Sequence, residues 1–125
     1  KFIEKRKKIA NIYNERLKKL SLLLPKINKN CSSSYHLYVV RINKKPYLKN
    51  RKKLYNYLRK NNIGSQVHYI PIYYHPFYKK MGFKKKYFIN NENYYQRTLS
   101  LPIYPSLKKR EQSKVIKLLK NYEKN

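Results

Sequence analysis

Aspartate is absent from the 125-residue sequence, glycine occurs only twice and cysteine only once. Gly64 and Gly82 stand far apart, so the chain has no glycine-rich loop of the kind that cradles a phosphate. Cys31 cannot form an intrachain disulfide, which fits a reducing compartment, and its surroundings "NCSSS" predict a loop. No apolar run approaches the ~20 residues of a membrane span, and no signal-peptide pattern is present. We therefore expect a cytoplasmic protein without a membrane partner.

Negative charge is scarce throughout the chain. Five glutamates face 32 lysines and arginines, for a formal charge of +27. Such an excess is typical of nucleic-acid binding, so a basic nucleic-acid-binding module is the alternative reading of the sequence. However, the basic residues are spread over every segment. Lysine, asparagine, tyrosine and isoleucine are also the residues that A/T-rich codons supply, and we hypothesise that genome composition explains much of the charge. On this view nucleic acid is not the expected partner.

Hydrophobic spacing predicts two long helices at the ends of the chain. From Phe2 to Leu24, apolar residues recur every three or four positions, which indicates a connecting amphipathic helix over residues 1–24 that Pro25 ends. The last segment, residues 106–123, has the same period. Its inward-facing positions are expected to be Val115, Ile116, Leu118 and Leu119.

Between these helices the pattern predicts three strands and two further helices. Residues 35–42, "YHLYVVRI", read as a central strand because apolar side chains occupy both faces. The segments 65–70 and 100–105 read as shorter strands, and 51–64 and 91–99 as helices. This order predicts an α+β fold, a small mostly antiparallel sheet packed against helices.

The segment from Pro71 to about Asn91 keeps no regular period. Prolines, Gly82 and seven aromatic residues predict a long irregular excursion. Long loops in compact domains are usually functional or disordered, and so many aromatic residues argue against disorder.

No catalytic or metal-binding constellation is visible among the residues themselves. The glutamates are scattered, and none of His36, His68 and His75 has the spacing of a metal ligand. His68 and Tyr69 lie at the end of a predicted strand, just before a proline, where ligands commonly meet a fold. Their alternative reading is a satisfied half-buried histidine beside a packed aromatic. His36 reads as a hydrogen-bonded core residue of the central strand, and His75 as exposed.

Three separated motifs together resemble one known family. "SSSYHLYVVRI", "NIGSQVHYIPIYYHPFYKKMGF" and "NNENYYQRTLSLPIYPSL" follow one another with the order and spacing found in the C-terminal part of the DegT/DnrJ/EryC1/StrS family. Members of this family are sugar-nucleotide aminotransferases that depend on pyridoxal 5'-phosphate (PLP). The nearest likeness is to the branch that aminates UDP-linked 4-keto-6-deoxy-N-acetyl hexoses, which leads to pseudaminic acid.

The resemblance implies a C-terminal small domain of a fold-type-I enzyme. In this family a large N-terminal domain carries the cofactor and its Schiff-base lysine, and the enzyme is a homodimer whose active site lies between subunits. The present sequence has no counterpart of the family's serine-aromatic-lysine segment before a Gly-Gly run. We therefore expect no catalytic and no cofactor-binding residue here, and an isolated chain that does not transaminate. The implied reaction transfers an amino group, from glutamate, to a nucleotide-linked keto sugar.

Carried over by motif, His68 and Tyr69 are expected to line the pocket for the nucleotide sugar. Pro71 and Tyr78 would shape the loop beside them, and His36 would support the pocket from behind. Arg51 matches an arginine that the family places near the start of the second helix, with either a structural or a ligand-binding role.

One position departs from the family pattern. Relatives often have serine or threonine before the last helix and an acid three residues later, which is a capping box. Lys108 occupies the first of these positions here, while Glu111 retains the second. The lost cap is expected to cost ~1 kcal/mol of stability unless Ser106 replaces it.

Overall fold

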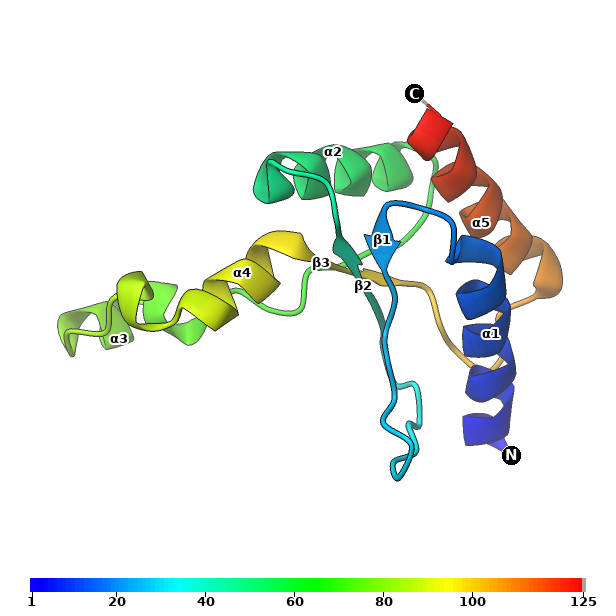
Figure 1. Ribbon diagram of the computed structural model, residues 1–125, viewed down its shortest axis with the longest axis horizontal. Helices are drawn as coiled ribbons and strands as arrows, with labels where there is room; N and C mark the ends of the chain where they lie inside the picture. Colours follow the sequence, from blue (N-terminus) through cyan, green and yellow to red (C-terminus); the bar gives the residue numbers. More distant parts are fainter. Residues whose placement is uncertain (125) are drawn as a thin grey trace.

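The computed structural model describes residues 1–124, and its first helix is shorter than the sequence predicts. Helix α1 spans Phe2–Leu17 and buries Ile9, Tyr13 and Leu17 (Figure 1). The prediction of a helix over residues 1–24 is wrong at its C-terminal end, because strand β1 (Leu22–Leu23) pairs there with β2. Leu20 and Leu24 continue the helical spacing, but the backbone partners offered by the sheet edge outweigh the small differences in helix propensity.

The sheet has three antiparallel strands in the order β1-β2-β3, which confirms the predicted fold class. Strand β2 (Tyr38–Ile42) is central, as expected, and β3 (Thr98–Leu101) lies beside it. The register pairs Tyr38 with Leu101 and Val40 with Leu99. Directly paired residues of antiparallel strands share one face, so these buried side chains form the sheet's side of the core.

Helix α2 (Tyr47–Lys60) begins four residues before its predicted start and directly follows Pro46. Its end is set by Asn62, which has a positive φ of 60°. The Ile63 N–H donates to the Leu58 carbonyl at 2.9 Å, and the Asn62 N–H donates to the Arg59 carbonyl at 3.0 Å. This is a Schellman ending, so asparagine terminates the helix before Gly64 is reached.

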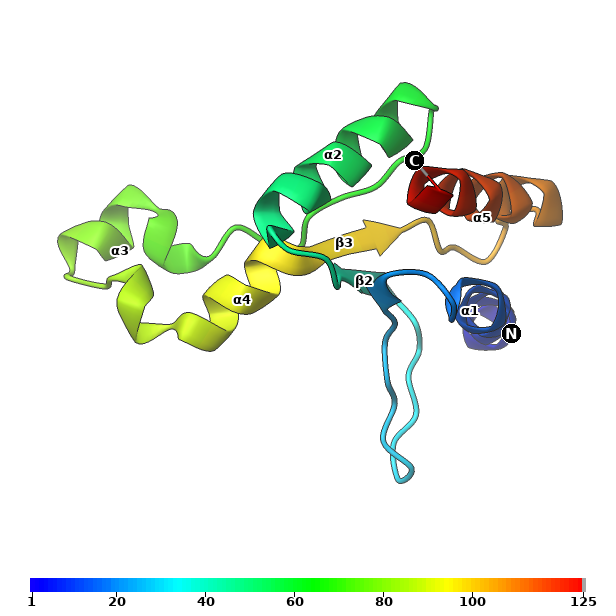
Figure 2. The ribbon, with the colours of Figure 1, turned by 45° about the horizontal axis from the view of Figure 1, so that its top comes forward.

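Helix α5 (Lys109–Lys124) packs beside α1 (Figures 1 and 2). Val115, Ile116 and Leu119 are buried as predicted, and Leu118 is half-buried. The buried Gln112 amide donates to the Ile9 carbonyl at 2.8 Å, which joins the two helices. The core therefore lies where α1, α2 and α5 meet the sheet.

Residues 69–97 form an extension that we call the arm, and it projects away from the core on the side opposite α1 and α5 (Figures 1 and 2). The expected irregular segment instead contains three short helices, η1 (Ile72–Tyr74), α3 (Pro76–Lys80) and η2 (Lys85–Tyr87). The helix predicted over residues 91–99 is confirmed as α4 (Ile89–Arg97), which begins and ends two residues earlier. Pro76 occupies the first position of α3, where its missing N–H is harmless. Gly82 adopts a φ of +87° between α3 and η2, a conformation open to glycine at little cost.

The predicted strand over residues 65–70 is not formed. Of these six residues, Gln66 alone pairs with β3. The Ser100 N–H donates a hydrogen bond to the Gln66 carbonyl at 2.8 Å. One flank of this bridge is blocked by Pro102, which has no N–H to offer, and the other by α4, which ends where β3 begins. For the same reason the third strand covers Thr98–Leu101 and stops before the proline, rather than extending over residues 100–105.

Half of the capping box survives at the start of α5. The Glu111 carboxylate accepts a hydrogen bond from the Lys108 N–H at 2.8 Å, as the acid of a capping box does. Lys108 supplies no hydroxyl in return, so one backbone donor of the first turn lacks its usual side-chain partner.

We expect the Lys108→Ser variant to restore the missing half of this box. A serine at the cap position should raise the free energy of unfolding by ~1 kcal/mol relative to Lys108→Ala, which has no capping group. Urea denaturation of the two variants measures the difference. Equal midpoints for both variants would contradict this account of the helix start.

Candidate functional site

His68 and Tyr69 lie where the chain leaves the sheet and enters the arm. The Gln66 bridge ends two residues before them, and Pro71 precedes η1 two residues after Tyr69. Their rings meet edge-on with centroids 4.7 Å apart. Tyr69 is 73% exposed, whereas His68 is half-buried. The two residues are neighbours in the sequence, and the structure places both at the root of the arm with their rings in contact.

The hydrogen-bonding capacity of His68 is not used within the described part of the chain. Its Nδ1 atom is buried and has no partner among residues 1–124. Buried polar atoms are rarely left without a partner, so such an atom requires an explanation from outside the visible contacts. A water molecule, a ligand or a neighbouring protein segment would each satisfy it.

The other candidates lie apart from this pair. Tyr78 sits on α3 in the outer part of the arm, where its ring meets Phe77 and Phe83 edge-on. His36 is exposed and precedes β2, so its assignment to the central strand as a core residue is wrong. The strand begins only at Tyr38, where pairing with Leu101 starts. His75 is exposed, as predicted.

Arg51 has a structural role in this structure. Its side chain is only 5% exposed, and Nη1 donates to the Tyr95 carbonyl on α4 at 2.9 Å. The guanidinium group also lies 4.8 Å from the centre of the Tyr95 ring. These contacts hold the base of the arm against α2. The planar guanidinium group takes part in both a hydrogen bond and a cation–π contact.

A second contact inside the arm was missed by the sequence interpretation. Glu92 on α4 is buried, and its carboxylate accepts a hydrogen bond from the Tyr73 hydroxyl at 2.7 Å. The Tyr73 ring stacks on Phe88 with centroids 4.8 Å apart. Residues 73 and 92 are 19 positions apart, and the only signal is that Glu92 is the single acid in a lysine-rich segment. This contact ties the outgoing and returning halves of the arm.

The hydrogen bonds around Glu92 also change its acidity. Burial alone would raise the pKa of this carboxyl group, but donation from Tyr73, Tyr74 and Gln96, together with the charge of Lys85, lowers the pKa below its ordinary value. In return, hydrogen bonding to Glu92 raises the pKa of Tyr74 to about 12. The ionised carboxylate is therefore the form that the folded arm stabilises.

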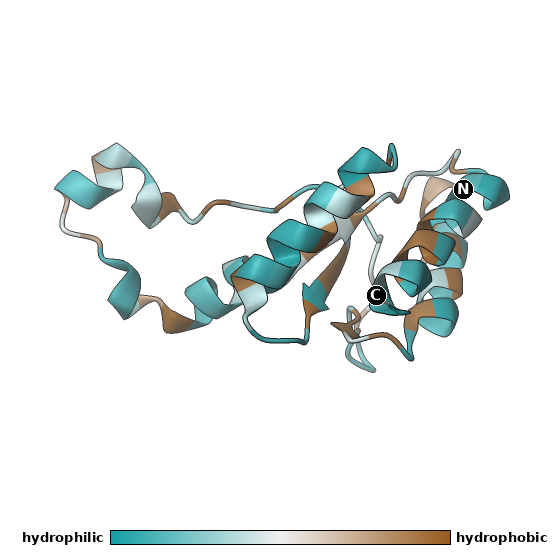
Figure 3. Cartoon of the chain, turned by 90° about the horizontal axis from the view of Figure 1, so that it is seen from above, coloured by the Kyte–Doolittle hydropathy of each residue, from teal (hydrophilic) through white to brown (hydrophobic). Residues whose placement is uncertain are grey.

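The arm leaves much of its apolar surface uncovered. Figure 3 shows apolar segments interrupting an otherwise polar ribbon along its length. Groups of exposed apolar side chains of this kind mark interaction surfaces, because water contact with them is unfavourable. The large exposed side chains of the arm are Tyr69, Ile70, Ile72, Phe77, Met81, Phe83, Tyr87, Ile89 and Tyr94.

Within residues 1–124, no three histidine, cysteine or acidic side chains come close enough to hold a metal ion. Over the same residues, no helix is both long and apolar enough to cross a bilayer. Cys31 is exposed in the connection between β1 and β2, in agreement with the predicted loop.

Comparison with solved structures defines the class of fold. DesV of S. venezuelae, solved in complex with a ketimine intermediate, superimposes with a TM-score of 0.89 at 24% sequence identity, over 99% of this chain and 32% of that one. A DegT/DnrJ/EryC1/StrS aminotransferase from Brucella abortus superimposes with a TM-score of 0.81 at 26% identity, over 99% of this chain and 32% of its own. The α+β fold with its projecting arm is therefore that of the corresponding third of these enzymes.

The sequence comparison identifies the family. The profile of the DegT/DnrJ/EryC1/StrS aminotransferase family matches residues 1–120, and the chain belongs to this family. Over 106 residues it is 45% identical to an uncharacterized protein of Methanocaldococcus jannaschii, covering 83% of this chain and 28% of the relative.

Two further relatives carry functional names. The chain is 35% identical to the spore coat polysaccharide biosynthesis protein SpsC of Bacillus subtilis over 97% of its length and 32% of the relative's. It is also 35% identical to the UDP-4-amino-4,6-dideoxy-N-acetyl-beta-L-altrosamine transaminase of Campylobacter jejuni, over 84% of this chain and 28% of the relative. The chain thus spans about a third or less of the length of these relatives.

The arm should loosen in acid because of Glu92. Since its pKa is lowered in the fold, its stabilisation is complete above the ordinary value of 4.5 and disappears as pH falls through the lower folded value. Glu92→Gln should remove this step, and Glu92→Ala should weaken closure of the arm by ~2 kcal/mol, as expected for loss of a charged hydrogen bond. NMR signals of the Tyr73 ring followed from neutral pH into acid measure both effects.

The matched control is Glu111→Gln, which removes an acid at the start of α5 and leaves the arm unchanged. The acid step should persist in this variant. If the Tyr73 signals titrate identically in the native chain and in Glu92→Gln, Glu92 does not hold the arm.

Proposed function

We propose that this chain forms the C-terminal domain of a PLP-dependent aminotransferase that acts on nucleotide-linked sugars. The amino group would pass from an amino donor, glutamate, to a 4-keto-6-deoxy sugar carried by a nucleotide. Membership of the aminotransferase family and the likeness to an altrosamine transaminase support this assignment. The same relative favours the UDP-linked branch, which leads to pseudaminic acid.

The observation that carries the proposal is the pairing of His68 with Tyr69 at the root of an arm that is apolar and uncovered. A half-buried imidazole with an unused nitrogen and an exposed phenol offer two hydrogen-bonding groups side by side. Sites for small molecules combine a few such polar groups with apolar walls. We assign the apolar walls to another segment of protein that packs on the arm, either the region absent from this chain or a second subunit.

PLP itself does not fit residues of this chain. The sequence contains no aspartate to pair with the pyridinium nitrogen, and its two glycines stand apart from any loop that could receive the phosphate. We therefore place cofactor binding in the part of the enzyme that corresponds to the unmatched length of the relatives. That cofactor would supply the chemistry of amino transfer.

The roles left to this chain are binding, orientation and exclusion of water. Tyr69 and His68 would donate or accept hydrogen bonds at the nucleotide sugar, and Pro71 would fix the direction in which the arm leaves the sheet. Tyr78 and its aromatic neighbours would keep α3 rigid. Packing of the exposed arm onto its partner would then close the site, and basic side chains would attract the anionic nucleotide.

The predicted effect on substrate binding is specific to this pair. In the protein produced from its complete gene, Tyr69→Phe and His68→Ala should each weaken binding of a UDP-linked sugar by about tenfold, the effect of one hydrogen bond to a charged ligand. Tyr104→Phe alters another exposed tyrosine outside the arm and should bind normally. Calorimetric titration measures the affinities. Unchanged affinity in both variants would remove the pair from the site.

The second candidate function is nucleic-acid binding, which the charge of +27 favours. The arm also places five lysines, Lys79, Lys80 and Lys84–Lys86, among exposed aromatic side chains. If charge were the function, affinity for DNA would fall steeply with salt concentration. We expect DNA retention to disappear at physiological salt while binding of UDP-sugar persists. The opposite pattern would support the nucleic-acid module and contradict the aminotransferase assignment.

A further inference from the structure

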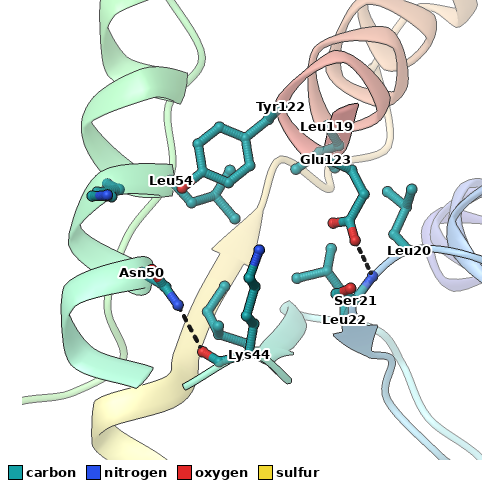
Figure 4. Close-up of a pocket in the computed structure, with 11 residues that line it drawn as sticks. Leu20, Ser21, Leu22, Lys44, Asn50, Leu54, Leu119, Tyr122 and Glu123 are labelled. Carbon is teal, nitrogen blue, oxygen red and sulfur yellow. Dashed lines mark hydrogen bonds between the residues drawn. The ribbon is translucent and has the colours of Figure 1, made fainter. Parts of the chain in front are cut away.

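A cavity of about 290 Å³ lies between α2, α5 and the edge of the sheet, and no residue of the arm contributes to it (Figure 4). Its volume is at the lower limit for small-molecule sites, which excludes a nucleotide and admits a compound of a few carbon atoms. It is therefore separate from the surface around His68. Its lining residues are Leu20, Ser21, Leu22, Ile42, Lys44, Asn50, Lys53, Leu54, Leu119, Tyr122 and Glu123.

Apolar side chains supply the walls of this cavity. Leu54 and Leu119 are buried core residues that reach it from α2 and α5, and Leu22 reaches it from the edge strand. Figure 4 shows these side chains surrounding the open space. An aliphatic group placed there would exchange water for contact with leucines, which is favourable in proportion to the area covered.

Positive charge enters the cavity from Lys44 and Lys53. In Figure 4 the Lys44 side chain extends into the space between Tyr122 and Glu123. The described residues 1–124 contain two ion pairs, at Lys7–Glu4 and Lys18–Glu15, and neither involves these lysines. Lys44 and Lys53 are both exposed residues at the border of the cavity, and neither ammonium group has a carboxylate within ion-pair distance among the described residues.

Negative charge enters from the opposite side. One oxygen of Glu123 (Oε1) accepts a hydrogen bond from the Ser21 N–H at 3.1 Å, which fixes the carboxylate at the cavity wall. The residue also belongs to the last turn of α5, where the helix dipole adds negative potential. Lys44 and Glu123 thus line the same cavity from different elements without forming an ion pair.

The apolar walls, the two lysines and Glu123 together determine which kind of ligand fits the cavity. A simple anion would meet the carboxylate of Glu123 and the negative end of α5, and a simple cation would meet two lysines. A small molecule that carries both charges, with an aliphatic part, satisfies every wall at once. We propose that the cavity binds a free aliphatic α-amino acid, with its carboxylate at Lys44 and Lys53 and its ammonium group at Glu123.

This site goes beyond the proposed aminotransferase function and does not depend on it. The amino acid would be bound as an effector or stabilising ligand at a site that His68 does not line, and no bond in it would be made or broken. Because the ligand would bind the folded chain and not the unfolded chain, the melting temperature should rise as ligand is added.

Three matched compounds test the double-charge requirement. L-Leucine carries both charges, 4-methylpentanoate lacks the ammonium group, and 3-methylbutylamine lacks the carboxylate. We expect leucine at about 10 mM to raise the melting temperature of the purified chain and each analogue to bind about tenfold more weakly or less. A plain carboxylate that binds as well as leucine would overturn the proposal, as would the absence of any shift with leucine.

Three variants locate the binding. Lys44→Gln and Glu123→Gln should each weaken leucine binding by about tenfold, and the glutamine can still accept the Ser21 hydrogen bond. Lys52→Gln changes an exposed lysine on α2 that does not line the cavity, and it should bind leucine like the native chain. Equal affinity in Lys44→Gln and Lys52→Gln would show that leucine binds elsewhere and would overturn the proposal.

Discussion

The short length of β3 is the constraint on which the arm depends. The strand is preceded directly by α4 and followed directly by Pro102, and among residues 1–124 Gln66 alone pairs with its outer edge. The chain must therefore leave the sheet at once after this bridge, and it returns through α4 to the start of the same strand. His68 and Tyr69 stand at this point of departure. The exposure of Tyr69 and the half-buried position of His68 follow from the geometry of the sheet edge and from the proline that follows them.

Two polar contacts hold the arm together where it projects from the sheet. Arg51 joins α2 to the last turn of α4, and Glu92 joins α4 to Tyr73 on the outgoing half. In both contacts a buried charged group forms a hydrogen bond to another element, and burial strengthens such a bond. These two contacts tie the arm together although many of its large apolar side chains are exposed. Exposed apolar groups of this kind are typical of interaction surfaces.

The elements that the sequence predicted well are those whose burial is decided locally. The centre of β2 and the inner face of α5 followed from apolar spacing, because those side chains face one continuous core. The predictions that were wrong concern segments whose structure depends on a partner far away in the sequence. Leu20 and Leu24 match the helical spacing of α1, yet Leu22 pairs with Ile42, and nothing within residues 1–24 indicates that pairing. Likewise, residues 65–70 have strand composition but meet a neighbour that is too short to pair with them.

The site shows the same division. The position of His68 and Tyr69 was predictable from a proline and from aromatic density close by in the sequence. The role of Glu92 was not predictable, because its hydrogen-bond partner Tyr73 lies 19 residues away in the sequence. Only the folded arm brings the two side chains together. His36 was placed in a strand because its neighbours are strand formers, whereas pairing begins two residues later at Tyr38. The resemblance to the family predicts that Tyr78 belongs with this pair, whereas the fold places Tyr78 on α3 in the outer part of the arm.

Under the proposed function, another protein segment covers the arm and completes the surface beside His68. Hydroxyl-radical labelling with mass spectrometry can compare the 125-residue chain with the protein made from its complete gene. Labelling of Tyr69, Phe77 and Met81 should fall several-fold in the complete protein, while Tyr104, outside the arm, provides the reference. Equal labelling of the arm in both proteins would contradict the account.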